Sequence, residues 1–295
     1  PPAPGVPGGS VGGAVGELMP RVAELLRDLD GMPGDSPVRD LEVLLGHCLG
    51  KSRTWLYTWP DTELQGADLA RFEALRERRR GGEPVAYLTG ERAFWSLDLQ
   101  VAPCTLIPRP ETESLVEWAL QLPLDRRISA LDLGTGTGAI ALALASERPN
   151  WELTGVDSSE SAVALARRNA AANQLQRVQF LRSDWMRALP GRRYDLIVSN
   201  PPYVDPEDPH LERGDLRFEP RSALVAAEHG LADLAHIIDA APDYLSADGW
   251  LLLEHGFEQG DAVRERLRYR GFHAVETRRD LAGLERISGG HWRAQ

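Results

Sequence analysis

After Glu113 the chain alternates short apolar runs with longer segments in which apolar residues recur at helical spacing. Apolar runs of about four to eight residues predict buried strands, and the longer amphipathic segments predict helices. In chain order the predicted elements are Ile128–Leu133, Ala139–Glu147, Glu152–Val156, Ser161–Ala172, Val178–Leu181, Asp195–Ser199, Leu231–Leu245, Trp250–Glu254, Gln259–Arg268, Ala274–Thr277 and Leu284–Ser288. This alternation predicts an α/β domain with a doubly wound, mostly parallel sheet and helices on both faces.

The preceding part of the chain shows helical periodicity with short connections. One helix is predicted to begin at Ser36 and Pro37, which suit an N-cap and a first turn, and to end before Gly50. A second helix is predicted from Asp68 to Arg80. Its last turn is a run of arginines, which we expect to be a solvated helix end rather than a binding site. The pattern predicts a small helical bundle.

Between Tyr87 and Pro110 the chain changes to aromatic residues, alternating apolar positions and prolines, which predicts a hairpin or an extended linker. We therefore expect a disordered leader over residues 1–16, a helical domain over 17–90, a hairpin and linker over 91–113, and the α/β domain over 114–295. The leader is rich in proline and glycine and lacks the charged and apolar regions of a secretory signal.

Composition narrows the classes of function. Asp and Glu outnumber Lys and Arg by 44 to 33, and the net charge of −11 argues against a large non-specific nucleic-acid surface. No run approaches the roughly 18 apolar residues of a membrane span. The two cysteines form no CxxC pair and the seven histidines are scattered, so we expect no metal and no disulfide. A reducing, cytoplasmic location fits best.

A glycine-rich turn joins the first predicted strand of the α/β domain to the helix that follows it. Its residues are Gly134, Thr135, Gly136, Thr137 and Gly138. Glycines let the backbone approach a ligand, and the amides at a helix N-terminus can face its polar groups. An acid about 20 residues later completes a nucleotide-binding pattern. That acid, Asp157, ends the next predicted strand, where its carboxylate can accept hydrogen bonds from both hydroxyls of a ribose.

A third predicted strand ends at Asp184 and Trp185. Strand ends converge on one crevice in folds of this kind, so Asp184 could meet an adenine amine and Trp185 its ring. Asp184 could instead cap a loop, and Trp185 could simply pack against the core.

The sequence Asn200-Pro201-Pro202-Tyr203 directly follows an apolar strand and points to a specific chemistry. The nitrogen of an amide or aromatic amine is a poor nucleophile because its lone pair is delocalised. The Asn200 Oδ1 and the Pro201 carbonyl can accept its two N–H bonds and direct the lone pair at an electrophilic methyl group. Pro202 stiffens the turn, and Tyr203 offers a face for a planar substrate. With the glycine turn, this predicts methyl transfer from S-adenosylmethionine to a planar nitrogen.

From about Ser36 to Ile287 the sequence closely resembles the bacterial peptide-chain release factor glutamine methyltransferases, also called HemK or PrmC. Besides the glycine turn and Asn200 to Tyr203, the resemblance is carried by Gly82 to Gly90, Thr105 to Glu113, Arg217 to Pro220 and Leu251 to Gly256. It implies a Rossmann-like, seven-stranded methyltransferase domain, preceded by a helical bundle that helps to dock the protein substrate and by a β-hairpin linker.

The same resemblance implies the reaction. The glutamine of the Gly-Gly-Gln loop in class I release factors is methylated on its side-chain amide nitrogen, in the service of translation termination. S-adenosyl-L-methionine is the cofactor and S-adenosyl-L-homocysteine the product. By position, Gly134 to Gly138, Asp157, Trp185 and Asn200 are implied to contact the cofactor, and Asn200 to Tyr203 the glutamine. Arg109 and Glu111 lie in the matching linker, where a structural role and substrate contact stay open.

Three alternatives remain. A nucleic-acid methyltransferase acting on an exocyclic amine of adenine or guanine shares the Asn-Pro-Pro-Tyr logic, but it normally needs an added target-reading surface. Only the N-terminal helices could provide one, through Trp55, Tyr57 and Trp59, and we favour packing or protein contact for those rings. A non-catalytic cofactor-binding protein would not need Asn200, and a nicotinamide dehydrogenase would need other polar groups. We expect a monomer without stable nucleic-acid binding.

Overall fold

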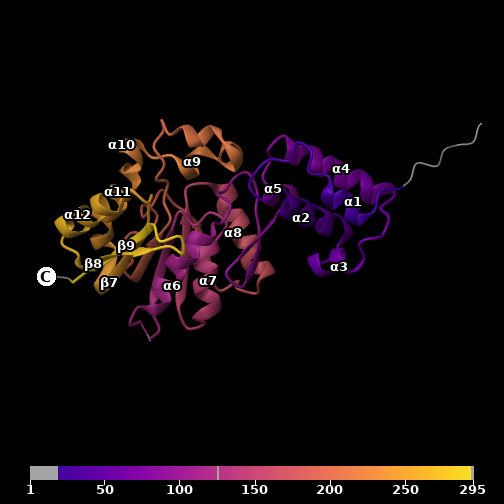
Figure 1. The fold of residues 1–295 in the computed structure, drawn as a ribbon. Helices are drawn as coiled ribbons and strands as arrows, with labels where there is room; N and C mark the ends of the chain where they lie inside the picture. Colours follow the sequence, from indigo (N-terminus) through magenta and orange to yellow (C-terminus); the bar gives the residue numbers. More distant parts are fainter. Residues whose placement is uncertain (1–18, 125, 294–295) are drawn as a thin grey trace, which may run out of the picture. The chain divides into compact units, whose positions relative to one another are not determined.

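The computed structural model describes residues 19–124 and 126–293 (Figure 1). The predicted leader, residues 1–16, lies outside the described residues. The chain divides into two compact units, Pro1–Gly81 and Gly82–Gln295. The predicted boundaries at residues 90 and 113 are finer than this division and stay predictions.

The first unit is built from four helices in its described part, which are α1 (Val22–Arg27), α2 (Pro37–Leu49), α3 (Arg53–Thr58) and α4 (Gly66–Arg80). The helix α2 ends where Gly50 takes a left-handed conformation with φ of 60°, which suits a residue without a Cβ atom. Leu41, Leu44 and Leu45 of α2 and Phe72 of α4 are fully buried. The helical bundle is thus held by the apolar faces that the sequence predicted.

The arginine run at the end of α4 is only partly solvated. Arg79 is only 7% exposed, and its Nε donates to Asp40 Oδ2 at 2.8 Å. Arg76, one turn earlier, is also buried and donates to Asp28 Oδ2 at 2.5 Å. A buried guanidinium needs a partner carboxylate to offset the loss of hydration. These ion pairs tie α4 to the first helices of the bundle, so the prediction of a solvated end was wrong for Arg79.

The second unit contains a hairpin and a seven-stranded sheet. The hairpin strands are β1 (Glu91–Phe94) and β2 (Leu97–Gln100), and the sheet strands are β3 (Ser129–Leu133), β4 (Glu152–Asp157), β5 (Gln179–Arg182), β6 (Tyr194–Ser199), β7 (Leu245–Glu254), β8 (His273–Arg279) and β9 (Glu285–His291). The order is β5-β4-β3-β6-β7-β9-β8; neighbours from β5 to β7 pair in parallel, and β9 is antiparallel to both of its neighbours. The predicted α/β fold and hairpin are confirmed.

The α-helices of this unit are α5 (Val85–Thr89), α6 (Glu113–Gln121), α7 (Ala139–Glu147), α8 (Glu160–Ala172), α9 (Arg221–Leu224), α10 (Ala227–Gly230), α11 (Ala232–Ala240) and α12 (Gly260–Arg270). The short 3-10 helices are η1 (Pro110–Thr112), η2 (Pro209–Glu212), η3 (Gly214–Phe218) and η4 (Ala241–Asp243). The helix predicted over Leu231–Leu245 ends early, at Ala240. Pro242 has no N–H to continue it, and Leu245 already begins β7.

Alternate side chains of the strands build two cores, one on each face of the sheet. Val198 and Leu252 pack with residues of α6, α7 and α8, whereas Ile197 and Leu251 pack with residues of α11 and α12. In Figure 1, α6 and α7 lie together on one side and α11 and α12 on the other. Residues of a strand point alternately to the two faces, so strands covered on both faces are apolar throughout. Polar residues therefore stand at the ends of the strands, where a binding site can form.

None of the helices within residues 19–124 and 126–293 is long and apolar enough to cross a membrane. In the same ranges no three His, Cys, Asp or Glu side chains gather in a way that could hold a metal ion.

Candidate active site

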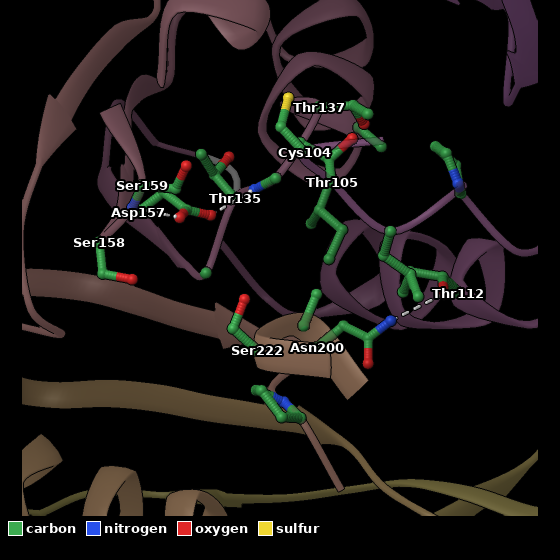
Figure 2. Close-up of a pocket in the computed structure, with 18 of the residues that line it drawn as sticks. Cys104, Thr105, Thr112, Thr135, Thr137, Asp157, Ser158, Ser159, Asn200 and Ser222 are labelled. Atoms are coloured by element: carbon green, nitrogen blue, oxygen red, sulfur yellow. Dashed lines mark hydrogen bonds between the residues drawn. The ribbon is translucent and has the colours of Figure 1, made fainter. Parts of the chain in front are cut away.

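A cavity of about 300 Å³ opens at the carboxyl ends of the central strands of the second unit (Figure 2). The glycine turn follows β3, Asp157 ends β4, Asp184 and Trp185 follow β5, and Asn200 follows β6. Of the residues that the sequence assigned to the site, the cavity is lined by Gly134, Thr135, Gly136, Thr137, Asp157, Asp184, Trp185, Asn200 and Pro202. The parallel strands thus bring residues from four segments to one place.

The glycine turn is held in a conformation that few other residues adopt. Gly134 and Gly136 have φ of 68° and 54°, in the left-handed region. Between them, the Thr135 N–H donates to the Val156 carbonyl at 2.9 Å, and the Thr135 hydroxyl donates to Asp132 Oδ2 at 2.6 Å. These bonds hold the turn against β3 and β4. Because glycine has no side chain, the backbone of the turn is open to the cavity at Gly134 and Gly136.

Asp157 presents its carboxylate at this turn. Its Oδ2 accepts the Gly136 N–H at 3.0 Å and its Oδ1 accepts the Ser159 N–H at 2.9 Å. Burial raises the pKa of Asp157 above its usual value, and the two N–H donors oppose that rise. A carboxylate oxygen can accept a second hydrogen bond. Each Asp157 oxygen therefore keeps an acceptor position, which is what a pair of ribose hydroxyls requires.

Asp184 and Trp185 lie in the loop after β5, which Ser183 shapes. The Ser183 hydroxyl donates to the Trp185 carbonyl at 2.5 Å and accepts the Ala188 N–H at 3.0 Å. Trp185 has φ of 47°, which is uncommon for a side chain of its size. The Asp184 side chain is 56% exposed and pairs with Arg187 at 2.9 Å. Both residues line the cavity, and contact with an adenine stays a prediction for each.

Asp132 is a fully buried carboxyl beneath the glycine turn. Its Oδ2 also accepts the Ala141 N–H at 3.3 Å, while its Oδ1 has no hydrogen-bond partner among the described residues. Burial raises the pKa of Asp132 to about 7. In the unfolded chain the group ionises near its usual pKa of about 4. Between these two values the folded protein therefore binds a proton that the unfolded chain has lost.

We expect this proton to make stability depend on pH. As pH rises from about 4 to about 7, Asp132 should lower the free energy of unfolding progressively. Asp132→Asn cannot titrate, so the stability of the variant relative to the wild type should rise with pH over that window. Urea unfolding of both proteins without ligand, across a pH series, measures the difference. Parallel curves for the two proteins would rule out the raised pKa.

Asn200 stands at the carboxyl end of β6, next to β3. The preceding residue fixes this end, because the Ser199 hydroxyl donates to the Leu133 carbonyl at 2.7 Å. The Asn200 Nδ2 donates to Thr112 Oγ1 at 3.2 Å. In Figure 2 this bond joins Asn200 to Thr112, away from Asp157 and Ser159. The Asn200 Oδ1 is left as the acceptor that a substrate amine would meet.

Comparison with known proteins assigns this chain to a family. The model of the PrmC N-terminal domain matches residues 21–90, and that of the methyltransferase small domain matches residues 112–214. The release factor glutamine methyltransferase of Salmonella typhimurium is 56% identical over 259 residues, which cover 88% of this chain and 93% of that protein. This chain belongs to the release factor glutamine methyltransferases. The family member of Pseudomonas aeruginosa is 54% identical over 93% of this chain and 99% of its own.

Solved structures with lower identity share the fold of this release factor glutamine methyltransferase. A methyltransferase from Pyrococcus furiosus superposes with a TM-score of 0.52 at 20% identity, covering 77% of this chain and 98% of its own. The hMettl16 catalytic domain superposes with a TM-score of 0.54 at 15% identity, covering 77% and 82%. At these identities the likeness concerns the fold alone.

Three residues assigned to the site of this family member do not line the cavity. Gly138 is the N-cap of α7, and a Cβ atom there would lie 3.0 Å from Phe180, so its role in the structure is close packing. Pro201 is buried. Tyr203 packs against the core between the sheet and α11, and its hydroxyl donates to Glu254 Oε1 at 3.2 Å. Contact of these residues with cofactor or glutamine stays a prediction.

Other residues of the cavity wall were not singled out from the sequence. They include Thr105, Leu106, Pro108 and Thr112 from the linker, together with Ser158, Ser159, Ser222, Ala223 and Asp233. The linker segment carries the family resemblance, but no pattern separated its cavity-facing residues from the rest. Arg109 also lines the cavity and forms an ion pair with Glu219, whose side chain is fully buried and accepts the Ile107 N–H at 3.0 Å. Glu111 is exposed and lies outside the cavity wall.

Proposed function

We propose that this enzyme transfers the methyl group of S-adenosyl-L-methionine to the side-chain amide nitrogen of the glutamine in the Gly-Gly-Gln loop of class I release factors. Family membership over most of the chain supports the reaction and its substrate. The observation in the site that carries the proposal is Asn200, which lines the cavity and whose Nδ2 donates to Thr112, so that Oδ1 is the acceptor of its amide.

The cavity fits the cofactor in its chemistry. The glycine turn leaves room at the end of β3, and Asp157 has an acceptor position on each oxygen. We assign the methionine part to the backbone of Gly134 to Gly138, the ribose to Asp157, and the adenine to the loop of Asp184 and Trp185. Bound there, S-adenosyl-L-methionine supplies an electrophilic methyl group on a positively charged sulfur and leaves as S-adenosyl-L-homocysteine.

The residues after β6 orient the methyl acceptor. The Asn200 Oδ1 and the Pro201 carbonyl accept the two N–H groups of the glutamine amide, which turns the nitrogen lone pair toward the methyl carbon. As the new N–C bond forms, the S–C bond breaks and the nitrogen becomes strongly acidic, so it loses one proton to the surroundings. No ionised base is needed before transfer. The contribution of the protein is orientation and fixed hydrogen-bond acceptors.

The substrate class is tested by offering both kinds of acceptor at once. The enzyme is incubated with labelled cofactor, purified release factor and bulk RNA or DNA, and the modified residue is mapped by mass spectrometry. We expect label on the glutamine of the Gly-Gly-Gln loop and none in nucleic acid. Label in nucleic acid alone would overturn the proposal in favour of methylation of a base amine.

We also propose that the helical unit helps to dock the release factor. Tyr57 and Trp59, on and just after α3, are 56% and 57% exposed, so simple packing does not explain these rings. Trp59→Ala should raise KM for the release factor about tenfold and leave kcat unchanged, because tryptophan is enriched among the residues that dominate binding at protein interfaces. A short Gly-Gly-Gln peptide should show no change. Tyr269→Ala, which removes another exposed ring on α12, is the matched control. An unchanged KM for the release factor would contradict docking at Trp59.

A cytoplasmic location, a monomeric state and the absence of stable nucleic-acid binding complete the proposal. The charge of −11 supports the last of these. Sedimentation of the protein alone and with RNA tests the state and the binding together. A stable dimer would contradict the monomeric state, and a stable complex with RNA would contradict the absence of nucleic-acid binding.

A further inference from the structure

A second cavity, of about 700 Å³, lies at the amino ends of the strands whose carboxyl ends form the active site. The described residues of its wall precede β3, β4, β5 and β6 or lie in the first half of these strands, and none of them belongs to a helix. The proposed methyl transfer uses only the other end of the sheet. This cavity is therefore a separate feature of the second unit.

One face of the sheet is polar where it meets this cavity. Ser129 of β3 stands opposite Glu152 of β4, and Thr154 of β4 stands opposite Gln179 of β5. All four residues line the cavity. Further along the strands the same face carries Leu131 of the apolar core. The change from apolar to polar side chains on one face indicates a wall that meets water or a polar ligand.

Arginines give this wall a positive charge. Among its described residues Glu152 is the one acid, and Arg127 Nε donates to Glu152 Oε1 at 2.9 Å. Arg192 is exposed, and its guanidinium has no hydrogen bond or ion pair with the described residues. Asp195 is not part of the wall and pairs with Arg126 at 3.0 Å. Only one arginine of the wall is thus offset by a carboxylate.

Two more arginines of the wall are held by uncharged groups. Arg177 donates to the Ala145 carbonyl. Arg193 Nη1 donates to the carbonyls of Pro242 and Leu245 at 2.9 and 3.1 Å. A carbonyl oxygen fixes the direction of a guanidinium but does not cancel its charge. With Arg192, the wall therefore carries three positive charges that no carboxylate neutralises.

Two buried donors of the wall also have no partner. Trp151 and Tyr194 line the cavity and are each 3% exposed. The Trp151 Nε1 and the Tyr194 hydroxyl form no hydrogen bond within the described residues. Buried polar groups are normally paired in folded proteins. The wall holds more donors than acceptors, so a ligand that suits it brings acceptor oxygens and negative charge.

We propose that this cavity binds an oligophosphate, either free or as the phosphate chain of a nucleotide. Guanidinium groups bind phosphate oxygens through paired N–H donors. Three unneutralised charges match a chain of phosphates better than a single carboxylate, and a cavity of about 700 Å³ has the size of a small-molecule site. The proposal goes beyond methyl transfer and does not depend on it.

Calorimetry of the full chain with tripolyphosphate tests the site. Saturating S-adenosyl-L-homocysteine fills the first cavity, and salt of about 0.15 M screens weak surface attraction. Arg192→Ala should raise the Kd for tripolyphosphate about tenfold, the order of one charged hydrogen-bonding contact. Arg168→Ala is the matched control, since Arg168 on α8 is also exposed, has no partner within the described residues and lies outside both cavities. It should leave Kd unchanged.

Glu152→Gln should act in the opposite direction. It removes the negative charge of the wall and releases Arg127, so the Kd for tripolyphosphate should fall about threefold. ATP in place of tripolyphosphate distinguishes the two sources. Equal affinity indicates that the phosphate chain alone is bound, and tighter binding of ATP indicates a nucleotide.

Three results would overturn the proposal. They are no binding of millimolar tripolyphosphate by the wild type, an equal Kd in Arg192→Ala and Arg168→Ala, and loss of binding when S-adenosyl-L-homocysteine is present. Binding of an RNA oligonucleotide without binding of tripolyphosphate would assign the wall to nucleic acid instead. The methyl transfer rate is measured separately, so failure of this site leaves the proposed function standing.

Discussion

Asn200→Ala should lower kcat at saturating S-adenosyl-L-methionine and release factor by about 100-fold or more, the loss seen when a fixed hydrogen-bonding group is removed from a reacting centre. The variant loses the oxygen that accepts from the glutamine amine and the bond from Nδ2 to Thr112. The amide nitrogen then keeps its delocalised lone pair and samples many orientations toward the methyl group. Single-turnover rates with labelled cofactor measure the effect directly.

The control for this variant is Asn150→Ala. Asn150 is exposed and precedes β4, so it lies at the opposite end of the parallel strands from Asn200. Asn150→Ala should leave kcat unchanged. Calorimetry should show that Asn200→Ala binds S-adenosyl-L-methionine with an affinity within a few-fold of the wild type, since the contacts assigned to Asp157 remain. A transfer rate in Asn200→Ala near that of the wild type would contradict the proposed mechanism.

The residues of the site that could be predicted are those at strand ends. The apolar runs located β3, β4 and β6, and parallel strands covered on both faces leave their carboxyl ends free for polar groups. Gly134, Asp157 and Asn200 each come directly after such a run, and the structure brings all three to one cavity. Periodicity, together with the residue types at the strand ends, thus indicated the central part of the site.

Contacts between distant segments could not be predicted in the same way. Thr112 meets Asn200 across 88 positions of the chain, and Glu219 meets Ile107 across 112. Nothing local to either residue marks its partner. The burial of Arg79 has the same cause, because its partner Asp40 stands on another helix. A run of arginines is normally solvated. Only the packing of the helices in the bundle shows that one of these arginines meets a carboxylate.

Adjacency to a site residue does not show which way a side chain points. Tyr203 follows Asn200 closely, and its ring was assigned to the glutamine. In the structure its hydroxyl reaches the buried Glu254, and its carbonyl accepts from Gln259 at 3.0 Å. Residues just beyond a strand end point to both the cavity and the core, and a short motif does not say which. The Tyr203 hydroxyl is thus bound at the core, and contact of the Tyr203 ring with the glutamine stays a prediction.

Asp157→Ala should raise the Kd for S-adenosyl-L-methionine by roughly 100-fold, because hydrogen bonds to a charged acceptor contribute about 1.5–3 kcal/mol each and two ribose hydroxyls lose theirs. S-adenosyl-L-homocysteine carries the same ribose and should lose affinity equally. The value of kcat at saturating cofactor should change far less, since Asn200 and its surroundings remain. Calorimetry with both ligands measures the two affinities.

Asp184→Ala provides the matched comparison at the same cavity. Both aspartates line it, but Asp157 is partly buried and anchored by the N–H groups of Gly136 and Ser159, whereas Asp184 is more than half exposed and paired with Arg187. A solvated, already paired carboxylate adds little to binding, so Asp184→Ala should raise Kd only about threefold. Because Asp157 also anchors the glycine turn, Asp157→Asn, which keeps one acceptor oxygen, should fall between the two. An unchanged affinity in Asp157→Ala would refute the ribose assignment, whatever the stability of the variant.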